Sequence, residues 1–538
     1  MNSLTKRLEV SLGPDTGDLS LRIGLHSGQV TAGVLRGDKS RFQLFGDAMN
    51  TTARIETTGE RNKIHVSAET AGLLMTAGKT HWIKEREDTV EAKGKGELKT
   101  FWLDLRSQSS PSAHSGGSSS GDDMSNAEGD KSSAPVETLT AGVVTSNDDA
   151  IRNAIAAKTT RLIEWNVDVL ARLLKEIKVR RKAQGTDKIK FKDPEDVFEG
   201  GAKIINEVKE IIKLPRYEGS LKDAKSVELD YDIVEQLRDY VSTIASLYRD
   251  NPFHNFEHAS HVTMSVVKLL SRIVAPDDVV DRKEGDIGAA LHDHTYGITS
   301  DPLTQFSCIF SALIHDVDHN GVPNNTLIAE NAAVAAAYGN KSVAEQNSVD
   351  IAWGLLMAPE YEALRGAIYI DESEMKRFRQ LLVNSLMATD IMDKDASKFR
   401  KARWEKAFSE NANSTDSELD SINRKATIVI EHLIQASDVS HTMQHWHIYS
   451  KWNERLFDEM YKAYKEGRAE KDPSENWYQG EIGFFDFYVI PLAMKLKTCG
   501  VFGVASDEYL NYATNNRREW EARGKDRVEQ MLAKYRDD

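Results

Sequence analysis

The chain has 538 residues, two cysteines and a formal net charge of −15, from 84 acidic and 69 basic residues. This length exceeds what one hydrophobic core normally holds, so two or more domains are expected. No dense stripe of Lys and Arg offsets the acidic balance, which argues against a nucleic-acid partner. No segment approaches the roughly 18 uninterrupted apolar residues of a membrane span.

Cysteine usage and the amino-terminal residues predict a cytoplasmic chain. Cys308 lies in an apolar run and is expected to be a buried thiol, so a disulfide framework is not expected and a reducing compartment fits. The first residues lack an apolar signal core. If the sequence is a fragment of a longer receptor-type protein, its place is the cytoplasmic face of a membrane.

Residues 1–105 predict a small α+β domain. The runs Leu21–Leu25 and Lys63–Val66 are typical of strands, and Asp47–Glu56 is typical of a helix. Residues 106–147 then turn to Ser, Gly, Asp and Ala. Such a composition buries too little apolar surface to offset the entropy of ordering, so a flexible linker is expected there.

Residues 148–538 predict a mainly α domain. Strand-like alternation is scarce, and apolar residues recur at the spacing of one helix face, beginning with Ile151, Ile155 and Leu162. Similar stretches run through Ile233–Leu247, Val262–Val274, Phe306–Ile314, Phe378–Met387, Ile428–Ile434 and Ile448–Tyr464. For any single apolar residue of these stripes, packing in the core is the ordinary explanation.

Two clusters of His and acidic residues lie about 60 residues apart, at His254–His258 and His315–His319. In each cluster the two histidines are four residues apart, which on a helix places them on one face. The second cluster follows the apolar run Ile309–Ile314, where burying polar groups without partners is costly. A lone histidine is usually structural, but two such clusters predict a centre for divalent metal ions.

Two other histidine positions are interpreted differently. His261 follows one turn after His258 and is expected to lie outside the ligand set or to face solvent. The run His292–His294 follows an acidic, Gly-containing stretch and precedes Gly297, so we expect it to be a loop and not a metal ligand.

Five motifs, in order, resemble the class I cyclic-nucleotide phosphodiesterases over about residues 227–520. They are Asn251–His258, Leu313–Gly321, Met387–Asp390, Ala436–Ser440 and Gly483–Asp486. The resemblance implies an all-helical catalytic domain that hydrolyses a 3′,5′-cyclic nucleotide to the 5′-monophosphate in intracellular signalling.

The resemblance also implies a ligand set for two cations. His258, His315, Asp316 and Asp438 would hold the tighter ion, Zn²⁺, and Asp316 would bridge to a hydrated Mg²⁺ or Mn²⁺. A water shared by both ions, acidified to hydroxide, would attack phosphorus. His254 would protonate the leaving oxygen as general acid.

Further residues receive roles from the same resemblance. Those expected to orient ligands and waters are Asp318, His319, Thr389 and Asp390. Phe484 would stack on the purine, although an ordinary core aromatic is the alternative. The residues expected to contact the nucleotide are His254, Asp438, His441, Glu481 and Phe484.

The chain departs from the family pattern where the base is read. Glu481 stands in place of a family Gln, with Gln479 nearby, and His441 stands where the family often has Asn. A family Glu-Asn-His-His segment becomes Glu345–Ser348. A carboxylate only accepts hydrogen bonds, so Glu481 suits the two adjacent donors of guanine and predicts a preference for cyclic GMP over cyclic AMP.

Residues 1–105 resemble the carboxyl half of class III nucleotide cyclases, closer to guanylyl versions. The resemblance places Asn50 and Arg54 at transition-state positions, where Arg offsets phosphate charge. Ordinary polar groups on a helix surface are the alternative for both. The metal-binding half of that family is absent from this sequence, so the segment is expected to be inactive alone. It is either part of a truncated gene model or a module that dimerises with another cyclase domain.

Two other functions stay open on the sequence alone. One is a non-catalytic cyclic-nucleotide sensor with altered base-contacting residues. The other is a His-Asp phosphohydrolase that acts on nucleotides that are not cyclic. The full ligand set with His254 argues against the first, and Phe484 beside a cyclase segment argues against the second.

Overall fold

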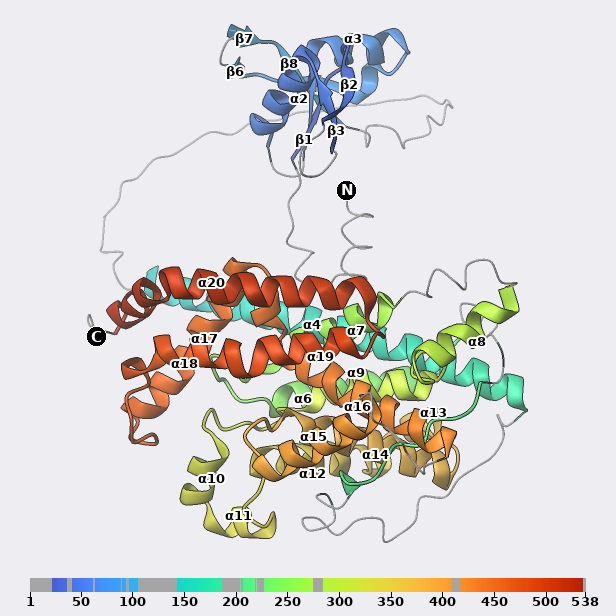
Figure 1. Ribbon diagram of the computed structural model, residues 1–538. Coiled ribbons are helices and arrows are strands. Elements are labelled where there is room, and N and C mark those ends of the chain that lie inside the picture. The colour runs from blue at the N-terminus through green and yellow to red at the C-terminus, as the bar shows by residue number, and fades with distance from the viewer. Residues whose placement is uncertain are drawn as a thin grey trace, which may run out of the picture. The chain divides into compact units, whose positions relative to one another are not determined.

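In this computed structural model the described residues are 22–35, 41–60, 63–88, 90–92, 96–104, 143–185, 204, 207–217, 219, 227–273, 284–408 and 417–535 (Figure 1). The chain divides into two compact units, Met1–Val144 and Thr145–Asp538. Most of the predicted linker lies outside the described residues. Helix α4 begins at Val143, shortly before the predicted domain boundary.

The first unit is an α+β domain, as predicted. Its sheet has the order β1-β4-β8-β5, with β1 and β4 parallel and the other neighbours antiparallel. Separate hairpins pair β2 with β3 and β6 with β7. The strands are β1 (Ile23–Leu25), β2 (Thr31–Leu35), β3 (Arg41–Phe45), β4 (Ile64–Ser67), β5 (Ile83–Glu85), β6 (Val90–Ala92), β7 (Gly96–Leu98) and β8 (Thr100–Leu103). The helices are α2 (Asp47–Thr57), α3 (Ala68–Thr76) and the short η2 (Thr80–Trp82).

Helix α2 packs directly on β1 because Gly24 has no side chain. A Cβ atom at Gly24 would lie 2.4 Å from the backbone nitrogen of Glu56, which no structure accommodates without a shift. Val66, Ala71 and Phe101 form the small apolar core of this unit. The close approach of β1 and α2 therefore fixes the helix that carries both cyclase-like positions.

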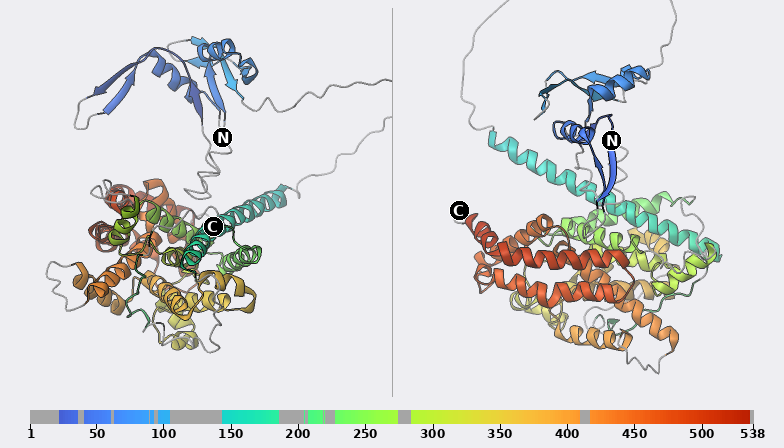
Figure 2. Two further views of the ribbon diagram at one scale, coloured as in Figure 1. Left: turned by 90° about the vertical axis from the view of Figure 1, so that its right-hand side faces the viewer. Right: turned by 45° about the horizontal axis from the view of Figure 1, so that its top comes forward.

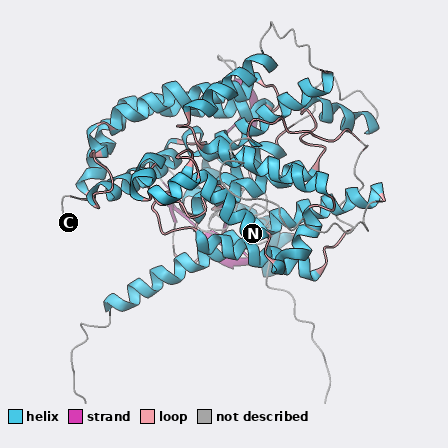
Figure 3. Cartoon of the chain, turned by 90° about the horizontal axis from the view of Figure 1, so that it is seen from below, coloured by secondary structure: helices cyan, strands magenta, loops and turns pink. Residues whose placement is uncertain are grey.

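The second unit consists of helices and loops throughout its described residues, which confirms a mainly α fold (Figure 3). Its longer helices are α4 (Val143–Gln184), α6 (Tyr231–Leu247), α7 (Phe256–Ser271), α8 (Glu284–His294), α9 (Pro302–Ile314), α12 (Val343–Leu356), α14 (Glu372–Thr389), α15 (Lys394–Phe408), α16 (Glu418–Asp438), α17 (Trp446–Lys465) and α20 (Gly503–Ala533). Shorter ones are α10 (Asn324–Glu330), α11 (Ala332–Ala337), η5 (Pro359–Tyr361), α13 (Glu362–Ile368), η6 (Ser440–Met443), η7 (Pro473–Glu475), α18 (Trp477–Phe484), η8 (Phe485–Val489) and α19 (Ile490–Thr498). Within the described part of the chain, no helix has the length and apolar character to cross a bilayer.

Four helices, α7, α9, α14 and α16, pack against one another in the core of this unit. Helix α9 is buried at every residue except Gln305, and nine of its thirteen residues are apolar. The start of α7 meets the ends of α9 and α16, and Gln435 near the end of α16 donates to the carbonyl of Ala388 near the end of α14. Outside this core, α19 and α20 run side by side (Figure 2).

The structure corrects three local predictions. His315–His319 is not helical, because α9 ends at Ile314 and the chain turns through Asp318, whose φ is 62°. His254 precedes α7, whose first helical residue is Phe256, so the histidine pair does not share a helix face. His292–His294 is the end of helix α8 and not a loop.

Candidate metal centre

The four predicted ligands come together where the ends of α9 and α16 meet the start of α7. His258 lies in the first turn of α7. Its backbone nitrogen donates a hydrogen bond to the side chain of Asn255 at 3.0 Å. His315 directly follows the last residue of α9, and Asp316 lies in the turn after it. Asp438 is the last residue of α16. Side chains that are far apart in the sequence thus meet where these helices converge.

The polar atoms of the four side chains face one another. His258 Nε2 lies 3.1 Å from Asp438 Oδ1 and 3.6 Å from Asp316 Oδ2. His315 Nε2 lies 3.1 Å from Asp316 Oδ2 and 3.4 Å from Asp438 Oδ1. Two ligand atoms bound to one Zn²⁺ at about 2.1 Å lie about 3.0 to 3.4 Å apart at octahedral or tetrahedral angles. The four separations are therefore close to the spacing that one ion needs.

His315 is oriented to offer its Nε2 atom. Its Nδ1 atom lies 2.9 Å from the carbonyl oxygen of Ala312, which keeps the ring proton on Nδ1. The Nε2 atom is buried and has no hydrogen-bond partner of acceptable geometry, although Asp316 and Asp438 lie within ion-pair distance. Leaving such an atom without a partner is costly. Two imidazoles and two carboxylates with one orphaned nitrogen fit Zn²⁺.

The electrostatics of the cluster also favour a cation. Burial raises the pKa of Asp438, but the hydrogen bond of His258 and the charges of His258 and His315 lower it more, below its usual value. Burial also raises the pKa of Asp316, but the charge of His315 lowers it more, to well below its usual value. Both carboxylates are therefore ionised at neutral pH. The carboxyl ends of α9 and α16 add partial negative charge at the same place.

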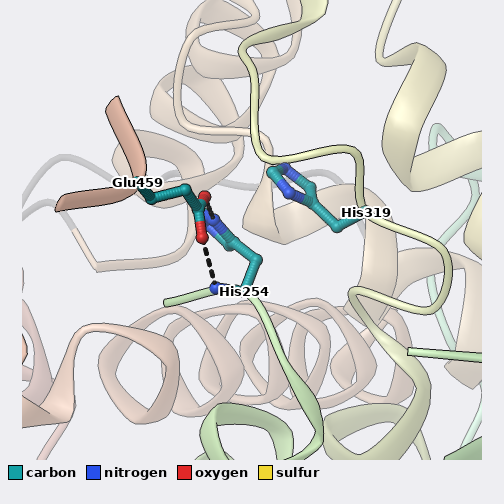
Figure 4. A group of neighbouring side chains, drawn as sticks. All are labelled: His254, His319 and Glu459. Carbon is teal, nitrogen blue, oxygen red and sulfur yellow. Dashed lines mark hydrogen bonds and ion pairs between the residues drawn. The ribbon is translucent and has the colours of Figure 1, made fainter. Parts of the chain in front are cut away.

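A second group, His254, His319 and Glu459, lies beside this cluster (Figure 4). His254 Nδ1 lies 2.5 Å from Glu459 Oε1. The other oxygen, Oε2, accepts from the backbone nitrogens of Phe253 and His254, both at 2.9 Å. The ring of His319 stacks on that of His254 with centroids 3.9 Å apart. Because both Glu459 oxygens are engaged, this carboxylate orients His254 and is a poor candidate for a metal ligand.

His254 is the cationic member of this group. Burial lowers the pKa of His254, but the charge and hydrogen bond of Glu459, and then Asp316 and Asp438, raise it more, to about 9. Burial and the charge on His254 lower the pKa of His319 to about 4, so that ring is neutral at pH 7. With its Nδ1 held by Glu459, His254 has its Nε2–H available to donate a proton.

A cavity of about 600 Å³ is lined by all three residues of the second group. Its lining includes Glu345 and three of the residues expected to orient ligands and waters, namely His319, Thr389 and Asp390. Burial and then the charge of Asp390 raise the pKa of Glu345 to about 8. Two carboxylates that repel each other in a cavity with room for several waters fit a hydrated divalent ion such as Mg²⁺ or Mn²⁺.

Asp318, by contrast, is not brought into this cavity. Its Oδ1 atom accepts from Arg249 Nε at 2.8 Å, and its Oδ2 atom accepts from Asn347 Nδ2 at 3.2 Å. The carboxylate therefore joins the loop after α6 to helix α12. The structure separates Asp318 from the other three residues with which the sequence grouped it.

His441, Glu481 and Phe484, which are expected to contact the base, are not among the residues that line the cavity of about 600 Å³. Phe484 stacks on Tyr488 with centroids 5.4 Å apart. Glu481 accepts from the hydroxyl of Tyr449 at 2.7 Å. His441 packs edge-on against Phe253, which itself packs on the ligand His258. Helix α18 continues regularly to Phe484, and its π-helical turn, η8, comes only afterwards. Gln479 is therefore not moved into the place of Glu481.

In the first unit, Asn50 and Arg54 both lie on α2, one turn apart as predicted. Asn50 is exposed and Arg54 is half-buried. Both side chains are therefore accessible on the helix surface, a placement that serves either the cyclase role or that of ordinary surface groups.

Sequence reasoning missed two residues of the site. Glu459 lies 205 residues from His254 on an amphipathic helix, where a single acidic residue is inconspicuous. Glu345 was noticed only as part of a weakened motif. Glu459 is buried and Glu345 is half-buried, and a periodic plot of α17 would have placed Glu459 on its apolar face. That placement is the signal by which Glu459 could have been found.

Asp438→Ala should remove the metal from the first cluster. We expect the affinity for Zn²⁺ to fall more than about 100-fold, because removal of groups that merely support ligands already costs 10- to 100-fold. Metal content after dialysis, measured by mass spectrometry, tests this, with circular dichroism to verify the fold. Asp318→Ala is the matched control, because that carboxylate faces Arg249. Equal zinc content in Asp438→Ala and wild type would exclude Asp438 as a ligand.

Comparison with known proteins assigns both parts of the chain. Residues 253–500 match the family model for 3′5′-cyclic nucleotide phosphodiesterase, and residues 3–105 match that for the adenylate and guanylate cyclase catalytic domain. The probable 3′,5′-cyclic-AMP phosphodiesterase pde-4 of Caenorhabditis elegans is 27% identical over 261 residues, 47% of this chain and 35% of the relative. The cGMP-specific 3′,5′-cGMP phosphodiesterase 3 of Dictyostelium discoideum is 26% identical over 222 residues, 41% of each chain.

The amino-terminal segment has its own relatives. Guanylate cyclase 2G of Mus musculus is 44% identical over 101 residues, 19% of this chain and 9% of the relative. The chain thus spans less than half the length of each of these curated relatives. Together with the helical fold and the converging His and Asp side chains, the matches place residues 253–500 in the 3′,5′-cyclic nucleotide phosphodiesterase family and residues 3–105 in the nucleotide cyclase family.

Proposed function

We propose that this protein hydrolyses a 3′,5′-cyclic nucleotide to the 5′-monophosphate, as a metal-dependent enzyme of intracellular signalling. The observation that carries the proposal is the convergence of His258, His315, Asp316 and Asp438 at the spacing of one ion. These four would hold Zn²⁺. Asp316 would face a second, hydrated Mg²⁺ or Mn²⁺ in the neighbouring cavity. When bound, the cations supply an acidified water as nucleophile and offset the charge of the phosphate.

His254 supplies the proton that the reaction needs. Cleavage of the bond from phosphorus to the 3′ oxygen leaves an alkoxide that must be protonated, and His254 Nε2 is the cationic donor beside the metal ligands. Glu459 supports this role twice, by fixing the ring through Nδ1 and by keeping it protonated. The stacked, neutral His319 adds no competing charge. Binding, orientation and proton transfer are thus divided among different side chains.

Glu481 favours guanine over adenine in this proposal. Tyr449 donates to its carboxylate at 2.7 Å, and Asn453 also forms a hydrogen bond with it. The amide oxygen of Asn453 accepts from Trp477 Nε1, so its NH₂ group points to Glu481. Held by two donors, the carboxylate stays an acceptor for the N1–H and N2–H groups of guanine. The named relatives include both cyclic-AMP and cyclic-GMP enzymes, so the expected preference for cyclic GMP rests on Glu481 and not on the relatives.

The amino-terminal segment is proposed to be inactive alone and to pair with another cyclase domain. Only Asn50 and Arg54 of the expected catalytic groups lie in it. We propose domains at 1–105 and 148–538, joined by a linker, in a cytoplasmic protein or at the cytoplasmic face of a membrane.

Removal of metal should abolish hydrolysis. We expect full-length protein treated with 1,10-phenanthroline and EDTA to release no 5′-monophosphate from cyclic GMP or cyclic AMP, and Zn²⁺ with Mg²⁺ to restore the rate. Chromatography of the products measures this. An undiminished rate in protein shown to be free of metal would contradict the proposed function, as would product from non-cyclic nucleotides alone.

Glu459→Gln should lower kcat about 10- to 100-fold, because the loss of its charge lets the pKa of His254 fall and general acid catalysis contributes about this much or more. Steady-state kinetics with cyclic GMP at pH 7 tests it, with zinc content expected to be unchanged. Glu454→Gln is the matched control on the same helix, since Glu454 pairs with Arg527. A wild-type kcat for Glu459→Gln would remove the role assigned to this residue.

The base preference should depend on pH through Glu481. Burial raises its pKa to about 7, only partly opposed by the bonds from Tyr449 and Asn453. Above pH 7 the ionised carboxylate only accepts, whereas below pH 7 the neutral acid has one donor and one acceptor, like an amide. We expect the ratio of kcat/KM for cyclic GMP to that for cyclic AMP to rise about tenfold from pH 6 to pH 8.

The ratio cancels pH effects common to both substrates, such as metal binding. Glu481→Gln is the control and should give a ratio that does not vary with pH, because an amide does not titrate in this range. A constant ratio in the wild type, or the same slope in Glu481→Gln, would show that Glu481 does not read the base.

A further inference from the structure

The turn before α12 contains a strained serine. Ser342 is buried and has φ of 40° and ψ of 51°, a left-handed conformation that residues with a side chain seldom adopt. It holds the N-cap position of α12, where a serine normally has an extended backbone and accepts a hydrogen bond from the helix. Ser342 makes no such cap bond. The fold therefore maintains an unfavourable backbone at this residue without the usual benefit.

The hydroxyl of Ser342 instead binds a carboxylate of the cavity. Its Oγ donates to Asp390 Oδ2 at 2.7 Å in a buried hydrogen bond. Asp390 Oδ1 accepts from the backbone nitrogens of Met392 and Asp393 at 2.9 and 3.1 Å. The only other donor described at Oδ2 is Asn324 Nδ2, at a long 3.4 Å. A carboxylate has about four acceptor sites and these four donors fill them, but the bond from Asn324 is long and weak, so a closer donor can replace it.

The turn is braced so that the serine cannot relax. Gln346 Nε2 donates to the carbonyls of Lys341 and Tyr338 at 2.6 and 3.1 Å, and its backbone nitrogen donates to Ser342 O at 2.9 Å. Gln346 is itself fully buried. These bonds close the turn on both sides of the serine. The direction of its hydroxyl is therefore set by the turn and not by free rotation of the chain.

The same bracing reaches the second carboxylate of the cavity. Asn324 accepts from the backbone nitrogen of Ala344 at 2.9 Å and donates to Glu345 Oε2 at 2.9 Å. Asp390 thus receives a fixed donor from Ser342, and Glu345 receives one from Asn324. Both line the cavity of about 600 Å³ that also contains His254 and His319.

We propose that Ser342 is a positioning residue for the hydrated second cation. It holds Asp390 so that Oδ2 accepts a hydrogen bond from a water bound to that cation, in place of the long bond from Asn324. Ser342 itself touches neither the cation nor the substrate. The proposal rests on the proposed function, because it requires a second cation near Glu345 and Asp390. Fixed donors behind a carboxylate keep it oriented.

Ser342→Gly separates the hydroxyl from the backbone, because glycine adopts positive φ without strain. The full chain is first loaded with Zn²⁺ and then titrated with Mn²⁺, with free Mn²⁺ measured by electron paramagnetic resonance. We expect Ser342→Gly to bind Mn²⁺ about 10- to 100-fold more weakly than the wild type. Its zinc content should be unchanged and its melting temperature equal or higher. The Mn²⁺ concentration for half-maximal hydrolysis should rise by the same factor.

Asn340→Gly is the matched control. Asn340 lies in the same turn, is exposed, and also has a positive φ of 56°. Its backbone nitrogen donates to Ala335 O, a bond that glycine keeps. Asn340→Gly should bind Mn²⁺ like the wild type. Ser342→Ala is the second variant, which loses the hydroxyl but keeps the strain, and it should match the weaker affinity of Ser342→Gly with a lower melting temperature.

Mn²⁺ affinities of Ser342→Gly and Ser342→Ala equal to that of the wild type would overturn the proposal for Ser342 and leave the proposed function intact. An equal loss in Asn340→Gly would also overturn it, because the effect would then come from the turn and not from the hydroxyl. If zinc-loaded wild-type protein takes up no Mn²⁺, the two-cation function itself fails, and the role of Ser342 fails with it.

Discussion

The arrangement of the site depends on the need to neutralise carboxylates that are buried where helix ends converge. Asp316 and Asp438 lie at or just beyond the carboxyl ends of α9 and α16, whose dipoles add negative charge at the same place. Burying ionised groups costs several kcal/mol each even after relaxation, unless opposite charge compensates it. Two imidazoles compensate only in part, and one of them leaves a nitrogen without a partner. A divalent cation resolves the imbalance, and the surrounding helices are packed tightly enough to keep the four side chains at its spacing.

The two sides of the centre differ in how they can satisfy a cation. On the closed side, the Nε2 atoms of His258 and His315 each lie 3.1 to 3.6 Å from an oxygen of Asp316 and from an oxygen of Asp438. On the open side, Glu345 and Asp390 face a cavity with space for several waters. A compact set of nitrogen and oxygen ligands suits zinc, and a site of oxygens with room for water suits magnesium or manganese. We propose that this difference in available space, together with ligand type, separates the two kinds of ion.

Proton transfer is organised from a different part of the chain. Glu459 reaches His254 from α17 and also accepts from the backbone that precedes α7, so one carboxylate both shapes the loop and charges the ring. The same helix supplies Tyr449, which holds Glu481. Helix α17 therefore supports the proposed acid at one of its ends and the proposed base-reading residue near the other. This sharing offers a physical reason for coupling substrate orientation to protonation.

The sequence by itself determined the elements and the chemistry. Apolar spacing identified the helices, the run before His315 predicted a buried helix that ends in ligands, and the residue types predicted divalent metal ions. Only the tertiary structure decided which groups meet. It ended α9 at Ile314 and turned the chain through Asp318, which sent Asp318 to Arg249 and His319 to His254, although their spacing suggested a common task. The tertiary structure also places Glu459 beside His254, 205 residues away in the sequence, and holds Ser342 in a left-handed backbone conformation. Local periodicity reports which face of a helix is buried, whereas contacts between distant segments depend on how the helices pack, and no local pattern encodes that.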